Sequence, residues 1–292
     1  MNNNKGLKLL FIINPGSGNN SVDHSAAIQQ YFSSLPHSIE LYTMPTQISP
    51  QKIAEKIKQS APDKVIAVGG DGTVKLVATA LVKTNIPLGI LPAGSANGMA
   101  KELGIPLSAQ EALNVVVNGE CKKIHMVYIN NQLCIHLSDI GFNAFVVQKF
   151  ETLQKRGMWG YVKAAWQVLK SNPRMQVSIH NGEDYIQREA AMVVIANATK
   201  YGTGVVINPK GRLDDELFEV IIVKEISLSE ILKMRFIHSP FDTSKTELLQ
   251  TAAIKIESKH KVHFQVDGEY FGKVNNVTAT ILPAAVQVIV PL

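Results

Sequence analysis

The chain is organised around Val65-Ile66-Ala67-Val68-Gly69-Gly70-Asp71-Gly72-Thr73. Its first four residues are apolar with no polar alternation, which is typical of a buried strand. Three glycines follow within four positions, and residues 74–82 have the pattern of a helix. A strand that leads through a glycine turn into a helix presents free backbone N–H groups and the positive end of the helix dipole, which bind anions such as phosphate. Glycine suits this turn because it can adopt positive φ and because a Cβ would keep a phosphate oxygen away from the amides.

Two similar turns follow two other predicted strands. Residues 7–13 lead into Asn14-Pro15-Gly16-Ser17-Gly18-Asn19, and residues 87–91 lead into Pro92-Ala93-Gly94-Ser95-Ala96-Asn97-Gly98. The first turn is neither a Walker A loop nor a GxGxxG fingerprint, so a ligand-facing turn and a plain strand-to-helix connection both stay open. Strands that alternate with helices predict a doubly wound parallel α/β sheet, on which the three turns would share the ligand-binding edge. The other elements expected in this half are a strand at 39–43 and helices at 26–35, 50–60, 99–103 and 111–118.

The pattern changes near Cys121, where short β-rich runs separated by turn residues begin. They predict an antiparallel β-sandwich or barrel, interrupted by one helix at roughly residues 157–169. We place the domain boundary at residue 124, with the second domain formed by residues 125–284. The predicted strands are 124–129, 134–140, 175–180, 190–196, 218–223, 253–258, 263–266, 278–282 and 285–290.

The composition of the chain restricts the class of protein to which it can belong and the kinds of partner that we expect. A chain of 292 residues suggests two domains, and 46% hydrophobic with 18% charged residues excludes a disordered protein. The net charge of +5 favours anionic partners such as nucleotides or anionic lipids, although a solvated basic surface would give the same value. No recognition motif accompanies this charge, so we expect no nucleic-acid partner.

The cysteines and the apolar runs indicate where in the cell we expect the protein. Cys121 and Cys134 form no CxxC motif, which favours a reducing cytosol. No run approaches the roughly 20 apolar residues of a membrane-spanning helix. We therefore expect a cytoplasmic protein that reaches any lipid from the membrane surface. Residues 155–166 and 231–237 mix cations with large apolar side chains, which suits either membrane contact or core helices with snorkelling cations.

Four motifs together resemble one family. They are Asn14–Gly18, Gly69–Thr73, Pro92–Asn97 and the later pair Gly202–Asp215 with Asp267-Gly268-Glu269. The chain resembles, over nearly its whole length, the diacylglycerol kinase catalytic family, which includes sphingosine kinases and small soluble bacterial lipid kinases. The resemblance implies an α/β nucleotide domain like that of phosphofructokinase, a β-sandwich domain, and ATP in the cleft between them. It also implies that residues 285–292 return to the first domain.

The resemblance implies roles for individual residues of the first domain. Those that would line the ATP site are Asn14, Thr43, Gly69, Gly70, Asp71, Gly72, Thr73, Ser95 and Asn97. Asp71 lies among the phosphates, so it would act through Mg²⁺ rather than on phosphate directly; its alternative role is to cap the following helix. Lys75 stands where relatives often have Asn, and it would either reach a phosphate or be a solvated helix lysine. Ser95 replaces a common threonine and keeps the hydroxyl.

In the second domain the resemblance implies a base and a metal site. Glu269 would be the general base that takes the proton of the lipid hydroxyl, with a solvated hairpin carboxylate as the alternative. Asp215, with the backbone carbonyls of Arg212 and Leu217, would bind Mg²⁺, for which hard oxygen ligands are suited. Glu216 stands where the family usually has glycine, which bears on the loop conformation. An acidic surface loop is the alternative.

The expected function is ATP-dependent transfer of the γ-phosphate to a lipid hydroxyl, with diacylglycerol as acceptor and phosphatidic acid as product. A NAD kinase is the alternative within the same superfamily, because NAD kinases also carry a GGDGT motif. A catalytically silent nucleotide- or lipid-binding regulator is the alternative from another class, supported by Glu216 and Lys75 alone. The resemblance is also compatible with a homodimer.

Overall fold

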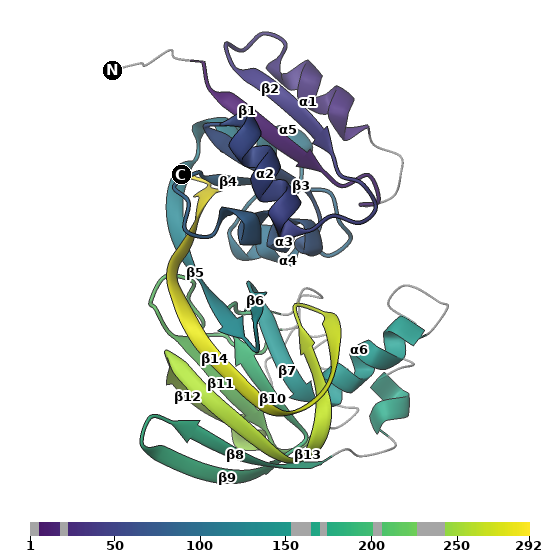
Figure 1. Ribbon diagram of the computed structural model, residues 1–292, viewed down its shortest axis with the longest axis vertical. Helices are drawn as coiled ribbons and strands as arrows, with labels where there is room; N and C mark the ends of the chain where they lie inside the picture. The colour runs from purple at the N-terminus through teal and green to yellow at the C-terminus, as the bar shows by residue number, and fades with distance from the viewer. Residues whose placement is uncertain (1–5, 18–22, 153–164, 170–173, 201–205, 227–242) are drawn as a thin grey trace. The chain divides into compact units, whose positions relative to one another are not determined.

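The computed structural model describes residues 6–17, 23–152, 165–169, 174–200, 206–226 and 243–292 (Figure 1). The chain divides into two compact units. Unit 1 comprises the residues up to Ile124 together with Ala284–Leu292, and unit 2 comprises His125–Pro283. None of the helices in the described part of the chain has the length and hydropathy that crossing a bilayer requires.

Unit 1 contains a parallel sheet in the order β2-β1-β3-β4. The bounds are β1 Lys8–Ile13, β2 Ser38–Thr43, β3 Lys64–Gly69 and β4 Leu88–Pro92. The last residues of β14 (Glu269–Val290) add a fifth parallel strand, because Val288 lies beside Leu88. The inner strands β1, β3 and β4 are almost entirely buried, as expected for parallel strands covered on both faces.

Helices cover both faces of this sheet, which confirms the predicted doubly wound fold. Their bounds are α1 His24–Phe32, α2 Pro50–Ser60, α3 Asp71–Leu81, α4 Gly98–Glu102 and α5 Ala109–Asn118. Helix α2 packs against α3, and α1 packs against α5. In Figure 1, α2 and α3 lie in front of the sheet and α5 lies behind it. Local signals fix the helix starts: Asp23 and Ser49 cap α1 and α2, and Pro50 takes the first position of α2.

Unit 2 is antiparallel, with the strand order β12-β11-β10-β7-β13-β14 and further strands paired to this path. The bounds are β5 Glu120–Ile129, β6 Gln132–Cys134, β7 Leu137–Gly141, β8 Met175–Asn181, β9 Asp184–Ala190, β10 Met192–Ala196, β11 Phe218–Val223, β12 Thr246–Thr251 and β13 Ala253–Val266, with α6 at Phe142–Thr152 and a 3₁₀ turn, η2, at Thr243–Lys245. Strand β13 pairs with β8 through Lys255–Ser258 and with β7 through Phe264–Val266. It therefore passes from one layer of the predicted sandwich to the other.

Alternation along β10 and β11 builds two cores in unit 2. Val193 and Ile195 face one side, where they join Phe218, Val220 and Ile222. Met192, Val194 and Ala196 face the other side, where Phe142 and Val146 of α6 cover them. Both faces of these strands are apolar because both are buried, which explains their continuous hydrophobic runs.

Some predicted elements differ from the structure. Helix α6 was not expected, nor were the largely polar strands β9 and β12. Strand β14 is continuous where two strands and a loop were expected, and β13 likewise joins two expected strands. The helix predicted at residues 157–169 lies mostly outside the described residues, of which 165–169 are helical.

Strand β14 also crosses the division between the two units. The crossing falls between Pro283 and Ala284, and Ala284 adopts a left-handed φ of 46°. The strand therefore contributes residues to unit 2 first and then to the sheet of unit 1.

Candidate functional site

The turn after β3 opens a helix N-terminus. Gly69 ends β3, Gly70 is the N-cap residue of α3, and its carbonyl accepts the backbone N–H groups of Thr73 and Val74 at 2.9 and 3.1 Å. No side chain caps this helix start. A helix N-terminus without a side-chain cap keeps its first N–H groups and its positive dipole end available for an anion.

The second and third turns touch through their glycines. A Cβ on Gly94 would lie 2.5 Å from the Cα of Gly70, and one on Gly69 would lie 2.3 Å from Thr73 Oγ1. The backbone N–H of Ala93 also donates to the carbonyl of Gly69 at 2.9 Å. The expectation of positive φ was wrong for these glycines, because none of them is among the left-handed residues. Gly70 and Gly94 are needed because their backbones approach each other closely, whereas a Cβ on Gly69 would meet the Thr73 side chain.

Gly72 is different, since a Cβ there would meet no atom within 4 Å. The residue is exposed and lies in the first turn of α3. Open space in front of a helix N-terminus is the room that a phosphate group requires.

The carboxylate of Asp71 joins two turns. Its Oδ2 accepts the N–H of Gly98 and its Oδ1 accepts the N–H of Met99, each at 2.9 Å. These are first-turn N–H groups of α4, whose own N-cap residue, Asn97, makes no side-chain cap. Asp71 therefore caps α4, and the alternative that it caps the following helix α3 was wrong.

Two asparagines complete the turns. Asn14 Nδ2 donates to Thr73 Oγ1 at 3.0 Å, and Asn14 Oδ1 accepts the N–H of Gly16 at 3.0 Å. Asn97 closes the third turn on itself, donating to the carbonyl of Gly94 at 2.8 Å and accepting its N–H at 2.9 Å. The structure thus brings Asn14, the β3 turn and Asn97 together at the carboxyl edge of the sheet.

A cleft of about 950 Å³ lies beside the first turn. Its lining residues are Asn14, Pro15, Gly16, Met44, Pro45, Thr46, Gln47, Ile48, Ser49, Lys52 and Leu76. A cavity of this size can hold a nucleotide-sized ligand. Thr43 ends β2 beside Ile13, immediately before the lining loop, and Ser95 is exposed in the third turn. Sequence reasoning missed the loop 44–49 and Lys52, because their place beside Asn14 depends on the pairing of β1 with β2.

Lys75 is not a solvated lysine. It lies in α3 with an intermediate exposure, and its ammonium nitrogen is shielded from solvent. The alternative that it is an ordinary solvated helix lysine was therefore wrong, and its contact with phosphate stays a prediction.

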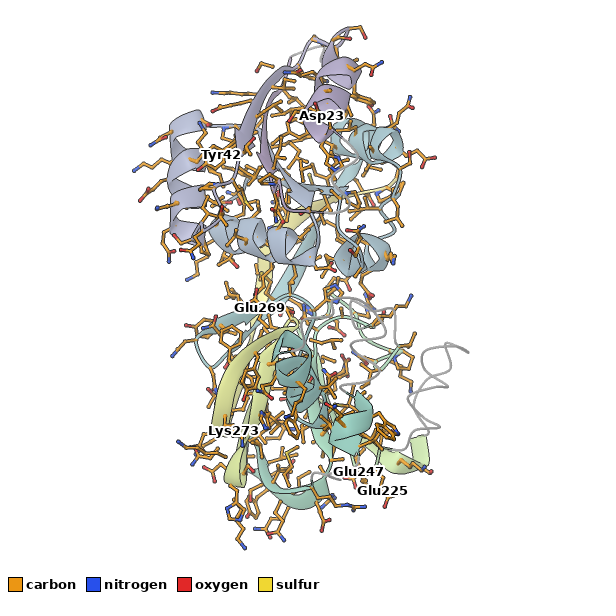
Figure 2. The ribbon with its side chains drawn as sticks, turned by 90° about the vertical axis from the view of Figure 1, so that its right-hand side faces the viewer. Asp23, Tyr42, Glu225, Glu247, Glu269 and Lys273 are labelled. Atoms are coloured by element: carbon orange, nitrogen blue, oxygen red, sulfur yellow. The ribbon has the colours of Figure 1, made fainter. Side chains whose placement is uncertain are left out.

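In unit 2, the β13–β14 hairpin carries Glu269. Asp267 and Gly268 adopt φ values of 51° and 84°, as the two-residue turns of tight hairpins require. Glu269 is exposed at the first position of β14, and Figure 2 shows Lys273 further along the same strand.

Asp267 holds this hairpin in place. Its carboxylate accepts the backbone N–H groups of Ile135, His136 and Leu137 at 3.2, 2.9 and 3.2 Å. The connection between β6 and β7 therefore wraps around one carboxylate. No local pattern in the sequence indicates these bonds to Asp267, since residues 135–137 are distant from it along the chain.

A buried polar network lies behind the hairpin. Gln265 accepts the N–H of Gly268 at 2.7 Å and donates to Oδ2 of Asp139, which also accepts Asn143 Nδ2 at 2.6 Å. Asp139 and Gln265 are each only 1% exposed. Two amide donors thus offset part of the desolvation of the Asp139 carboxylate. In the sequence, Asp139 lies within the apolar run of β7, and no pattern there indicates this network.

The predicted metal loop keeps the conformation that glycine would supply. Glu216 adopts a φ of 60°, and its N–H donates to His125 Nδ1 at 3.3 Å. Asp215 Oδ1 accepts the N–H of Leu217 at 3.3 Å, while Arg212 Nε pairs with Asp214 at 3.1 Å. Glutamate at this position is therefore accommodated in a left-handed conformation, which glycine adopts most readily.

Acidic side chains of this loop, Asp215 above all, affect the pKa values of neighbouring groups. Burial lowers the pKa of His125, against the opposing effect of Asp215, so the imidazole is neutral and can accept the N–H of Glu216. Burial raises the pKa of Glu219, and the nearby Asp215 charge adds to this effect. Within the described part of the chain, no three or more His, Cys, Asp or Glu side chains are grouped to hold a metal ion. The oxygens of Arg212, Asp215 and Leu217 suit Mg²⁺ chemically, and their use as ligands stays a prediction.

Comparison with known families accounts for nearly the whole chain. Residues 8–129 match the model of the diacylglycerol kinase catalytic domain, and residues 138–290 match the YegS C-terminal NAD kinase beta sandwich-like domain. The chain belongs to the diacylglycerol kinase catalytic family. This membership makes it a kinase of the ATP-dependent lipid kinase type.

Individual relatives are distant. The Escherichia coli protein named "Probable lipid kinase YegS" is 28% identical over 249 residues, which is 82% of each chain. An uncharacterized Synechocystis protein is 28% identical over 307 residues, covering 96% of this chain and 70% of its own length.

Solved structures of similar fold come from two kinds of kinase. A diacylglycerol kinase from Bacillus anthracis has a TM-score of 0.69 at 19% identity, covering 97% of this chain and 96% of its own. A NAD kinase from Archaeoglobus fulgidus in complex with ATP has a TM-score of 0.54 at 13% identity, covering 96% and 93%. At these identities both likenesses concern the fold alone.

Replacing Asp71 tests its structural role as the cap of α4. Asp71→Ala removes both acceptors of the α4 N–H groups, so the free energy of unfolding of unit 1 should fall by about 1–2 kcal/mol. Asp71→Asn keeps one oxygen acceptor and should lose less. Thermal unfolding followed by circular dichroism measures both variants, and an unfolding midpoint for Asp71→Ala equal to the wild type would contradict the capping role.

Two glycine substitutions test the close contact of the turns. Gly94→Ala places a Cβ against the Gly70 backbone and should lower both the unfolding midpoint and ATP affinity. Gly72→Ala meets no protein atom and replaces a glycine in a helix, so it should leave the unfolding midpoint unchanged or slightly higher while weakening ATP binding. Calorimetric titration with ATP, beside thermal unfolding, provides the two readouts. Equal stability of the two variants would show that the contact of the turns does not matter.

The hairpin of unit 2 permits a similar test. Asp267→Ala leaves three backbone N–H groups without their acceptor and should cost about 1–3 kcal/mol of stability. Glu269→Ala alters an exposed side chain and should change stability by no more than about 0.5 kcal/mol. Urea denaturation of both variants makes the comparison, and a loss for Glu269→Ala as large as that for Asp267→Ala would contradict it.

Proposed function

We propose that this protein transfers the γ-phosphate of ATP to the hydroxyl of diacylglycerol and releases phosphatidic acid. The observation that carries the proposal is the set of three joined turns of unit 1, with the uncapped N-terminus of α3 among them. Family membership supplies the reaction type, and diacylglycerol is the acceptor that we propose within it.

ATP would bind to unit 1 in two parts. The phosphates would lie at the N-terminus of α3, where Gly72 leaves open space and the helix dipole favours negative charge. The nucleoside would enter the cleft of about 950 Å³ between the first turn and the loop after β2, where Lys52 adds a cation. Thr43 and Ser95 would border the site with hydroxyl groups.

Mg²⁺ fits the donors near both proposed sites. When bound with ATP it would neutralise charge on the phosphates, and the Asp71 carboxylate supplies the kind of oxygen ligand that Mg²⁺ prefers. In unit 2, the Asp215 carboxylate and the carbonyls of Arg212 and Leu217 would hold a second ion, which would stabilise the loop around Glu216.

Glu269 would act as the general base. Its exposure at the start of β14 leaves it accessible to an acceptor hydroxyl, and Asp267 and Gln265 fix the turn that carries it. A positioned base contributes about 10²–10⁴-fold to the rate. Positioning of the two substrates and charge stabilisation would supply most of the remaining acceleration. The protein would meet its lipid at the membrane surface from the cytosol.

A transfer assay with radiolabelled ATP tests this function. The acceptors are diacylglycerol, monoacylglycerol, phosphatidylglycerol and sphingosine in neutral detergent micelles, together with NAD in solution. We expect labelled phosphatidic acid as the main product. Transfer to NAD and to no lipid would favour the NAD kinase alternative, and transfer to no acceptor would favour the silent regulator.

The same assay tests the base. Glu269→Ala should lower kcat by about 10²–10⁴-fold while the KM for ATP stays unchanged. The matched control is Glu183→Ala, because Glu183 is also an exposed carboxylate of a tight hairpin and lies in the turn between β8 and β9. Undiminished kcat in Glu269→Ala, or an equal loss in Glu183→Ala, would remove Glu269 from the mechanism.

A further inference from the structure

Unit 2 contains a second cavity, of about 630 Å³, which neither the family motifs nor the proposed mechanism uses. Its lining residues are Gly141, Phe145, Arg174, Met175, Gln176, Glu189, Ala191, Ser258, Lys259, His260, Lys261, Val262, His263 and Lys273. Apolar side chains of α6, β8 and β13 form part of the wall, and cations from two neighbouring strands accompany them. Such a combination suits a ligand with an anionic group and an apolar body.

An irregularity in β13 places the cations. Glu257 pairs with Asn276 and Val262 with Val274, so residues 258–261 face the single residue Asn275 on β14. This bulge lies where β13 ends its pairing with β8 at Ser258, before it pairs with β7 from Phe264. Bulges redirect side chains, and here the exposed residues 259–261 reach the cavity as a consequence.

The charge of the lining is strongly positive. Arg174 is engaged by Glu189 at 3.3 Å and by Glu225 at 3.0 Å. Among the described lining residues, Glu189 is the one carboxylate. Lys259, Lys261 and Lys273 therefore face the cavity without an acidic residue in its lining to balance them.

The aromatic wall is uncharged. His263 stacks on Phe145 with ring centroids 4.3 Å apart, and its Nδ1 lies 2.8 Å from the Tyr270 hydroxyl. Burial, helped by the charges of Lys273 and Lys149, lowers the pKa of His263 to about 4, so the ring is neutral near pH 7. Positive charge is therefore contributed by the lysines and Arg174, and His263 offers a flat, apolar face.

A buried hydroxyl adds a polar group to this lining. Ser258 Oγ is shielded from solvent and has no hydrogen-bond partner among the described residues. Buried polar groups are normally satisfied, so one that lines a cavity is a candidate contact for a bound ligand.

We propose that this cavity binds the phosphate headgroup of an anionic phospholipid and so docks unit 2 on an anionic bilayer. The lysines complement the phosphate, and the wall of Phe145, Met175 and Val262 suits the glycerol and upper acyl portions, which a free phosphate ion lacks. The site goes beyond the proposed function, since diacylglycerol carries no charge that these lysines could pair with. Its described lining includes no residue of the predicted docking stretches 155–166 and 231–237, which lie almost wholly outside the described residues.

Vesicle co-sedimentation tests the proposal. Wild-type protein is mixed with phosphatidylcholine vesicles that contain or lack phosphatidylglycerol, and the bound fraction is measured. Lys259→Glu with Lys261→Glu should weaken partitioning onto the anionic vesicles by about tenfold or more, because each lysine near an anionic surface contributes about fivefold. Both lysines are exposed, so the fold should persist.

The matched control carries the same change in net charge elsewhere. Lys58→Glu with Lys123→Glu alters two exposed lysines of unit 1 that do not line the cavity, and it should change partitioning far less. A loss as large as that of the cavity variant would show general electrostatic attraction and overturn the site. Equal binding of wild-type protein to both kinds of vesicle would overturn it as well.

A kinase assay in neutral detergent micelles separates docking from catalysis. The cavity variant should transfer phosphate there at the wild-type rate, since no anionic surface is present. Loss of transfer in micelles would place the cavity in the acceptor site and overturn the docking role. If wild-type protein phosphorylates no lipid, the proposed function fails while the vesicle measurement still decides this proposal. Binding of soluble tripolyphosphate without any preference for phosphatidylglycerol vesicles would overturn the membrane assignment.

Discussion

The two hydrogen bonds from the backbone of α4 to the Asp71 carboxylate connect turns that belong to different strands. Parallel strands deliver their turns to one edge of the sheet, but each turn still needs a neighbour to fix its conformation. Here the neighbours fix one another: Asp71 holds α4, Gly70 touches Gly94, and Asn14 bonds Thr73. The N-terminus of α3 can then stay free of a side-chain cap, because its surroundings are rigid without one.

Unit 2 uses the same physical device for its hairpin. The Asp267 carboxylate accepts hydrogen bonds from three consecutive backbone N–H groups, and the Asp71 carboxylate accepts two. In both units the carboxylate thereby fixes the conformation of the backbone around it. An ionised acceptor forms stronger hydrogen bonds than a neutral one, so a single side chain can order a whole connection. Glu269 lies two residues from Asp267 and is exposed. The two acidic residues of Asp267-Gly268-Glu269 therefore differ in their surroundings, because the Asp267 carboxylate binds backbone N–H groups and Glu269 lies at the surface.

The sequence was informative where a single local signal dominated. The run 218–223 is apolar apart from Glu219, and β11 has those bounds. The strands predicted at 278–282 and 285–290 were separated at Pro283 and Ala284, but β14 continues through both residues, and its first part, residues 269–277, was not predicted as strand. The apolar residues of α6 follow directly on β7, and no cap separated the two. The glycines in the sequence located the three turns. The contact that requires Gly70 and Gly94 depends on which strands are neighbours, and no local pattern contains that information. The same holds for the loop 44–49 and for Asp139.

Strand β14 has a consequence for the synthesis of this protein. Its first residues complete the hairpin of unit 2, and its last residues lie beside β4 in unit 1. Unit 1 is therefore discontinuous in the chain, and the ribosome makes almost all of it first and its fifth strand last. The edge of β4 that pairs with β14 cannot form these hydrogen bonds until residues 284–290 are made. Its backbone groups therefore stay unpaired while the whole of unit 2 is translated.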